Sequence, residues 1–137
     1  MSNQKFVISV LAVFATFQIL DAFIHMVVLR ETYEELEGLW RTNMNETVWV
    51  IFLTGLVQSI IFVYFFTVGV EGKGVREGIR FGFIFGLLMS FVSIFNQYAV
   101  YPIPLWLAWQ WFAYGLIQFM VCGIVVALIY QSNKEKA

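Results

Sequence analysis

The chain has 137 residues, of which 61% are hydrophobic and 12% are charged, and its formal net charge is −1. Soluble domains average about 45–50% apolar and about 25% charged residues, so this composition excludes an ordinary soluble domain. A near-neutral chain also lacks the basic face that nucleic-acid binding requires. Composition therefore predicts an integral membrane protein whose first partner is the lipid bilayer, with no nucleic acid bound.

Four continuous apolar stretches predict transmembrane helices at about residues 5–29, 47–70, 78–98 and 104–130. Each is long enough, because a span needs about 20 residues at about 1.5 Å per residue. Continuous rather than alternating hydrophobicity favours helices over barrel strands. Short connections place consecutive helices side by side. We therefore predict an all-α, integral membrane four-helix bundle with up-down-up-down topology, as a single transmembrane domain over residues 1–137.

Lysine and arginine residues are concentrated on one side of the predicted bundle. Only Arg30 and Arg41 lie on the other side, where all the tryptophans fall as an interfacial belt would. By the positive-inside rule, both termini are expected in the cytoplasm. The short polar termini are compatible with a prokaryotic inner membrane. The six residues that carry the orientation are Lys5, Lys73, Arg76, Arg80, Lys134 and Lys136.

The first extracytoplasmic connection is the longest and the most acidic. Tyr33, Leu36 and Trp40 recur in it at helical spacing, with glutamates between them. This pattern is typical of a short amphipathic helix on a membrane surface. We therefore expect such a helix outside the first span.

The first span carries a polar stripe. Gln18, Asp21 and His25 are spaced i, i+3 and i+7, which places them on one helical face. An ionised Asp near the bilayer centre costs about 2.5–3.5 kcal/mol on insertion scales, so it normally faces other helices or water. One interpretation is a proton- or cation-handling site in the outer half of the bundle. The other is a hydrogen-bonded pair that fixes this helix against Gln58, Gln118 or Asn96.

Metal, haem and catalytic chemistry find little support. His25 with Glu34 and Glu35 is a weak metal set, because protein metal sites usually need three or four ligands. A haem would accept His25 as one axial ligand, and the chain supplies no obvious second one. No cofactor is favoured. The sequence also lacks a phosphate-binding loop and a Ser/His/Asp or Cys/His arrangement, which favours a non-enzyme.

Small residues form a ladder at i+4 spacing in the third span. Such a stripe lets another helix approach closely. It predicts either packing inside the bundle or a seam with a second copy or a larger membrane complex. The residues of this helix-packing face are Gly74, Gly78, Gly82, Gly86 and Ser90.

A short pattern recurs after sixty residues. Trp49 and Gly55-Leu56-Val57-Gln58 of the second span are matched by Trp109 and Gly115-Leu116-Ile117-Gln118 of the fourth. Spans separated by two crossings point the same way, so the pattern predicts a parallel repeat of helical hairpins. Coincidence within a restricted apolar alphabet is the alternative.

Helix 1 and the connection after it carry a longer pattern, from Asp21 and His25 through Leu29 and Tyr33 to Leu39-Trp40-Arg41. The pattern resembles that of small, uncharacterised prokaryotic four-span membrane proteins that share D-x3-H…L…Y…LWR. The resemblance implies a topology and marks Asp21, His25, Tyr33, Trp40 and Arg41 as an outer-side site. It implies no reaction.

Three functions are compatible with these observations. The favoured function is a small structural or accessory subunit that packs against other membrane subunits or itself, because it requires the fewest specialised residues. The second is a minimal proton- or cation-coupled transporter or channel that uses Asp21 and His25. The third is a metal- or haem-binding membrane protein that uses His25. Neither a substrate nor a partner identity follows from the sequence.

Overall fold

The computed structural model describes residues 2–131, and no strand occurs in this range. Lys134 and Lys136, which contribute to the predicted orientation, lie outside the described residues. In chain order the elements are α1 (Asn3–Phe23), a π-helical turn (Ile24–Val28), α2 (Arg30–Glu35), a 3-10 turn (Glu37–Leu39), α3 (Met44–Gly69), α4 (Val75–Val100) and α5 (Leu105–Gln131).

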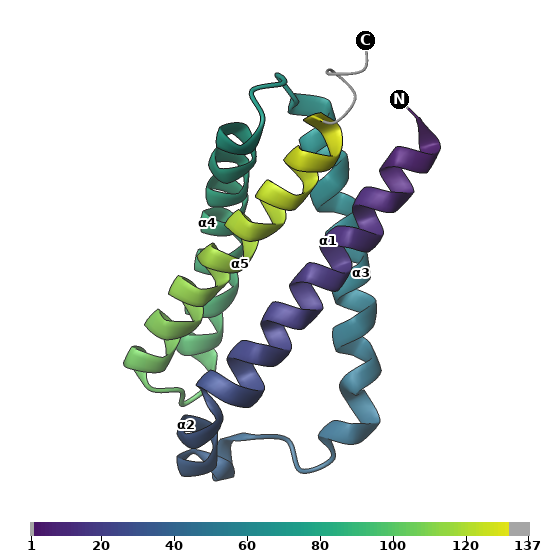
Figure 1. The fold of residues 1–137 in the computed structure, drawn as a ribbon. Coiled ribbons are helices and arrows are strands. Elements are labelled where there is room, and N and C mark those ends of the chain that lie inside the picture. The colour runs from purple at the N-terminus through teal and green to yellow at the C-terminus, as the bar shows by residue number, and fades with distance from the viewer. Residues whose placement is uncertain (1, 132–137) are drawn as a thin grey trace.

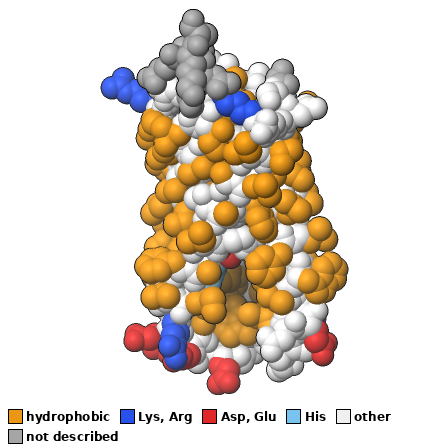
Figure 2. Space-filling view, turned by 45° about the vertical axis from the view of Figure 1, so that its right-hand side comes forward, with side chains coloured by type: hydrophobic (Ala, Val, Ile, Leu, Met, Phe, Trp, Pro, Cys, Tyr) orange, Lys and Arg blue, Asp and Glu red, His pale blue; other side chains and the backbone are white. Residues whose placement is uncertain are grey.

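Four of these helices are long and apolar enough to cross a membrane: α1 with the π turn, α3, α4 and α5. They run up and down alternately in one bundle (Figure 1). On the face shown in Figure 2, hydrophobic side chains form a belt between two ends that carry the charged groups. The predicted all-α membrane bundle is confirmed, and the protein is an integral membrane protein.

The two ends of the bundle differ. The termini end holds the start of α1 and the turn between α3 and α4, and the tryptophan end holds the other two connections (Figure 1). In the half nearer the termini, buried side chains of α1, α3 and α5 pack into a continuous apolar core that closes the bundle. This core consists of Val10, Val13, Phe62, Val63, Phe66, Phe119, Cys122, Val126 and Ala127.

Three of the observed spans begin two or three residues before the predicted ones, and α5 begins one residue after its predicted start. The largest differences are at α3, which begins at Met44, and at α4, which begins at Val75. The turn before α4 contains Gly72 and Gly74 with φ of 77° and 70°, a conformation that glycine adopts without strain. Hydropathy alone places helix ends where apolar residues begin, so it misses helical turns made of polar residues.

The connection between α1 and α3 forms the expected short helix, α2, followed by a 3-10 turn. Tyr33, Leu36 and Trp40 pack against a buried cluster at the tryptophan end that includes Ile24 and Leu107. These side chains form a cap on the bundle, because they cover apolar surface at its open end. The expected placement on the membrane surface stays a prediction.

The glycine ladder of α4 faces α5 inside the bundle. A Cβ built on Gly78 would overlap the carbonyl oxygen of Gly123, and one on Gly82 would overlap that of Phe119. Gly86 lies against the Phe119 side chain, and Ser90 lies over Gly115. The ladder thus provides close backbone contact between neighbouring helices of one chain, as small residues do in membranes.

Burial follows the sixty-residue repeat. The buried residues of α3 are Gly55, Ser59, Phe62, Val63 and Phe66, and sixty residues later α5 buries Phe119, Cys122, Gly123 and Val126, with Gly115 half-buried.

The contacts that the first helix of each hairpin makes with the second helix match as well. The Gln18 amide lies where a side chain on Gly55 would begin, and the Ser90 hydroxyl lies at the same place over Gly115. The offset here is 72 residues rather than 60, so the additional residues of the first hairpin lie in its connection. These paired contacts support a parallel repeat in which α1/α3 corresponds to α4/α5.

Candidate functional site

A cavity of about 360 Å³ lies in the tryptophan half of the bundle, above the apolar core. All four spanning helices contribute to its wall, and Figure 2 shows a hollow in this half with a carboxyl group at its edge. Aromatic rings line part of it, and the remainder is polar. The polar lining consists of Asp21 and His25 of the first span, Gln58 of α3, Ser90, Ser93 and Gln97 of α4, and Gln118 of α5.

Asp21 is the acidic group of this cavity. His25 Nε2 and Gln118 Nε2 both lie 3.4 Å from its Oδ1 atom. Among residues 2–131 no side chain donates to Oδ2, and the Asp21 side chain is 30% exposed. No lysine or arginine belongs to the described lining. The carboxylate therefore presents one open oxygen to a space that contains no fixed positive side chain.

His25 lies in the π-helical turn that ends the first span. The turn is closed by the Leu29 N–H, which donates to the Ile24 carbonyl oxygen at 2.9 Å. Single π turns of this kind occur often at functional sites. This one leads directly into α2, and so joins the helix that carries Asp21 and His25 to the segment that carries Tyr33.

The Tyr33 hydroxyl connects α2 to the first span and to α5. It hydrogen-bonds to His25 Nδ1, and it accepts a hydrogen bond from Trp111 Nε1 at 2.7 Å. Trp40 Nε1 donates to the backbone oxygen of Tyr33 at 3.0 Å. The Tyr33 ring also meets Trp40 edge-on, with ring centroids 4.9 Å apart. Two tryptophans and a histidine therefore hold Tyr33 in place, and two of the three, His25 and Trp111, line the cavity.

One arrangement of protons satisfies the whole chain of contacts. Trp111 is a donor only, so it donates to the Tyr33 oxygen, and the Tyr33 hydroxyl can direct its own hydrogen to His25 Nδ1. His25 Nε2 then donates to Asp21. The Tyr33 phenol keeps its proton, because burial raises its pKa to about 12, with a further increase from the Asp21 charge and an opposing effect of the Trp111 hydrogen bond. Both nitrogens of the His25 ring are engaged in this arrangement.

A second pocket of about 410 Å³ lies at the surface of the tryptophan end. Trp40 and Arg41 line it, together with the turn before α5. Gln97 and Trp111 belong to the walls of both spaces. These two side chains separate the surface pocket from the inner cavity, so Trp111 lies between the outside and Asp21.

The structure brings together most of the predicted site. Asp21, His25, Tyr33 and Trp40 form one connected group. Arg41 lines the surface pocket instead of the cavity. Gln18 packs over Gly55 and is not part of the cavity wall.

The weak metal set is not assembled. Glu34 pairs with Arg30 at 3.0 Å, with 65% of its side chain exposed, and Glu35 is exposed on α2. Within the described part of the chain, no three His, Cys, Asp or Glu side chains gather in a way that could hold a metal ion. His25 would also have to release Tyr33 or Asp21 to bind a metal or haem.

Three residues of the site were not identified as such from the sequence. Trp111 was noted only as part of the interfacial belt, and Ser93 and Gln97 were not noted at all. Aligning α1 with α4 at an offset of 72 residues would have identified two of them, because it matches Ser93 to Asp21 and Gln97 to His25. Gln118, by contrast, was expected as a partner and does contact Asp21.

No protein-family model, curated protein or solved structure matches this chain. The resemblance to small four-span prokaryotic proteins therefore stays a prediction. Function must be argued from the site itself.

Proposed function

We propose that the protein binds a small organic cation, an amine or ammonium compound, in the cavity beside Asp21. The observation that carries this proposal is the open Oδ2 atom of Asp21 in a cavity whose described lining has no lysine or arginine. A charge held within the membrane is costly unless it is paired. The nearest basic group, His25, has both ring nitrogens engaged by Tyr33 and by Asp21 Oδ1, so a bound cation would pair with the open Oδ2 atom.

The size and lining of the cavity favour an organic cation over a bare metal ion. A space of about 360 Å³ is far larger than an ion needs, and small-molecule pockets start at about 300 Å³. Trp111, Tyr114 and Phe119 supply aromatic surface, and cations are attracted to the faces of such rings. The amides of Gln58, Gln97 and Gln118 add neutral hydrogen-bonding groups that fix orientation.

The geometry supports binding from one side more than passage through the bundle. Below the cavity, Val13, Phe62 and Phe119 belong to an apolar core, and this cluster contains no charged side chain among the described residues. With the orientation expected from the positive-inside rule, the cavity belongs to the extracytoplasmic half. We include that orientation, and a prokaryotic inner membrane, in the proposal. The transporter alternative would require the core to open.

The accessory-subunit hypothesis stays a prediction. One of its arguments was the small-residue ladder, and Gly78 and Gly82 use that face to pack on α5. Co-purification with other membrane subunits would support the accessory-subunit hypothesis. For a metal or haem, His25 would first have to give up a hydrogen bond.

Matched ligands test the cation proposal directly. Choline and its uncharged isostere 3,3-dimethylbutanol have similar shapes, so the difference in their affinities isolates the charge. We expect choline to bind at least tenfold more tightly in calorimetric titrations of the purified protein, and tetramethylammonium and phenethylamine to compete with it.

The Asp21→Asn variant keeps the side-chain volume and should abolish this preference. Glu35→Gln, which removes an exposed carboxylate of α2, serves as the matched control and should leave it intact. Equal binding of the charged and uncharged isosteres, the same preference in Asp21→Asn, or no binding of any of the three cations would contradict the proposal.

A further inference from the structure

An apolar groove runs between α3 and α4 on the side of the bundle away from α1. Near the termini end it encloses about 380 Å³ between Phe65 and Phe66 of α3 and Ile84 and Leu88 of α4. A second apolar space of about 450 Å³ continues toward the tryptophan end, and Phe85 belongs to the walls of both. The two spaces follow one another along the helices, with the Phe85 side chain between them.

The length of the space nearer the termini end fits one acyl chain. Its wall runs along α4 from Glu77 to Leu88, eleven residues or about 16 Å at about 1.5 Å per residue. The hydrocarbon core of a bilayer is about 30 Å thick, so this space spans close to one leaflet. A lipid of the leaflet at the termini end would therefore reach the end of the groove with its tail.

The equivalent interface elsewhere in the bundle is packed differently. If the two hairpins were arranged symmetrically, the contact between α1 and α5 would resemble that between α3 and α4. Instead α1 packs directly on α5 in the half nearer the termini, with the Phe17 and Phe119 rings 5.5 Å apart and Cys122 Sγ 3.9 Å from the Val13 carbonyl oxygen.

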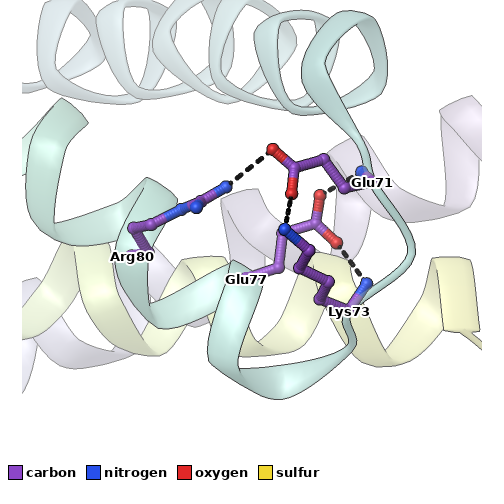
Figure 3. Close-up of polar contacts among 4 residues, drawn as sticks. All are labelled: Glu71, Lys73, Glu77 and Arg80. Carbon is purple, nitrogen blue, oxygen red and sulfur yellow. Dashed lines mark hydrogen bonds and ion pairs between the residues drawn. The ribbon is translucent and has the colours of Figure 1, made fainter.

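Positive charge lies at the rim of the groove. The Arg80 guanidinium bonds Glu71 Oε1 at 3.0 Å through one nitrogen, and Lys73 pairs with the other oxygen of the same carboxylate (Figure 3). This pairing lowers the pKa of Glu71, chiefly through the hydrogen bonds from Lys73 and Arg80. Arg80 keeps further N–H donors, since a guanidinium has five.

The second carboxylate of this turn does not compete for the cations. Glu77 is buried, and its two oxygens accept hydrogen bonds from the backbone N–H groups of Glu71 and Lys73 (Figure 3). It organises the turn. With Arg76 included, the segment 71–80 carries three basic and two acidic side chains, so its net charge is +1.

We propose that the α3–α4 groove binds an anionic phospholipid of the leaflet at the termini end, with one acyl chain in the groove and the phosphate at Arg80 and Lys73. This site is separate from the cavity beside Asp21. It does not depend on the cation-binding proposal.

Native mass spectrometry of the delipidated full-length protein tests the site. The probes are phosphatidylglycerol and phosphatidylcholine with identical chains, and glycerophosphate as a headgroup without chains. We expect phosphatidylglycerol to bind more tightly than phosphatidylcholine, and glycerophosphate not to bind at the same concentrations. Arg80→Gln should weaken phosphatidylglycerol binding about fivefold, the effect of one basic residue near a lipid surface.

Glu71→Gln separates lipid binding from a structural role of the turn. It releases the same two cations, so it should strengthen phosphatidylglycerol binding, whereas a role limited to folding would make both substitutions act in the same direction. Arg76→Gln, an exposed charge on the same helix end outside the groove wall, is the matched control and should have less effect than Arg80→Gln. Equal binding of the two lipids, binding of glycerophosphate as tight as that of the lipid, or equal losses in Arg76→Gln and Arg80→Gln would overturn the proposal.

Discussion

The two hairpins share one plan but differ in how closely their helices approach. In the second hairpin, α4 and α5 meet through backbone, because Gly78 and Gly123 leave no space for a side chain between them. In the first, the Gln18 amide lies between α1 and Gly55. The second hairpin is a tightly packed scaffold, whereas the looser first hairpin leaves space for polar groups.

The same contrast extends to charge and to connection length. Asp21 and His25 of the first hairpin correspond to the neutral Ser93 and Gln97 of the second, and all four line one cavity. The long connection of the first hairpin also brings Tyr33 over that cavity. The repeat thus provides two similar walls of one cavity. The residues that differ between the two hairpins provide its charged and titratable groups.

The largest expected effect distinguishes the two glycine contacts. A Cβ on Gly123 would overlap the backbone of Gly78, which cannot move aside, so Gly123→Ala should destabilise the protein by about 3 kcal/mol. In Gly55→Ala the new methyl group meets only the flexible end of Gln18, and the cost should be much smaller. Unfolding of both variants in detergent measures this difference, and equal losses would refute the distinction between the hairpins.

Removing the Tyr33 hydroxyl tests the connection that is special to the first hairpin. Tyr33→Phe leaves Trp111 Nε1 and His25 Nδ1 without their partner, which should cost about 1–3 kcal/mol in the same unfolding assay. Tyr98→Phe on α4 removes an exposed hydroxyl and should change stability by much less. If the two substitutions had the same effect, Tyr33 would not hold the cap in place.

Moving the charge across the repeat tests the equivalence of Asp21 and Ser93. Cation binding lost in Asp21→Asn should recover by at least tenfold when Ser93→Asp is added, because both positions line the same cavity. The affinity of choline in the single and double variants measures the recovery. A double variant that folds but binds no better than Asp21→Asn would show that the two walls are not interchangeable.

The smallest effect is a pH dependence at the cap. The pKa of Tyr33 is raised from 10.0 to about 12, so the folded protein keeps this proton at a pH where the unfolded chain loses it. The stabilisation from Tyr33 is therefore complete below pH 10 and is lost between pH 10 and about 12. The thermal unfolding temperature should fall more steeply over this pH interval in the wild type than in Tyr33→Phe. Identical slopes of unfolding temperature against pH in the two proteins would contradict this prediction.

Most of the architecture follows from local features of the sequence. Four apolar runs of about twenty residues predict four spans, because backbone groups in lipid must pair within each segment. The spacing of Gly78, Gly82 and Gly86 likewise predicts a packing face, and the i+4 spacing of Asp21 and His25 predicts their contact. These features depend only on residues within a few turns of one helix.

The site required the tertiary structure. Nothing local to α1 indicates that Trp111 of α5 reaches Tyr33, or that Tyr33 packs on the end of the bundle. The groove between α3 and α4 likewise depends on the tertiary packing of the two hairpins, because its walls come from one helix of each.

The sequence by itself thus determined the membrane-spanning class, the helices, the close-packing face and the acidic residue held within the first span. Only the tertiary structure decided which helices surround Asp21 and that its pairing remains incomplete among the described residues. The physical reason is that hydrophobic length and helical periodicity are properties of single segments. The balance of charge in a cavity, by contrast, depends on side chains that come from four helices.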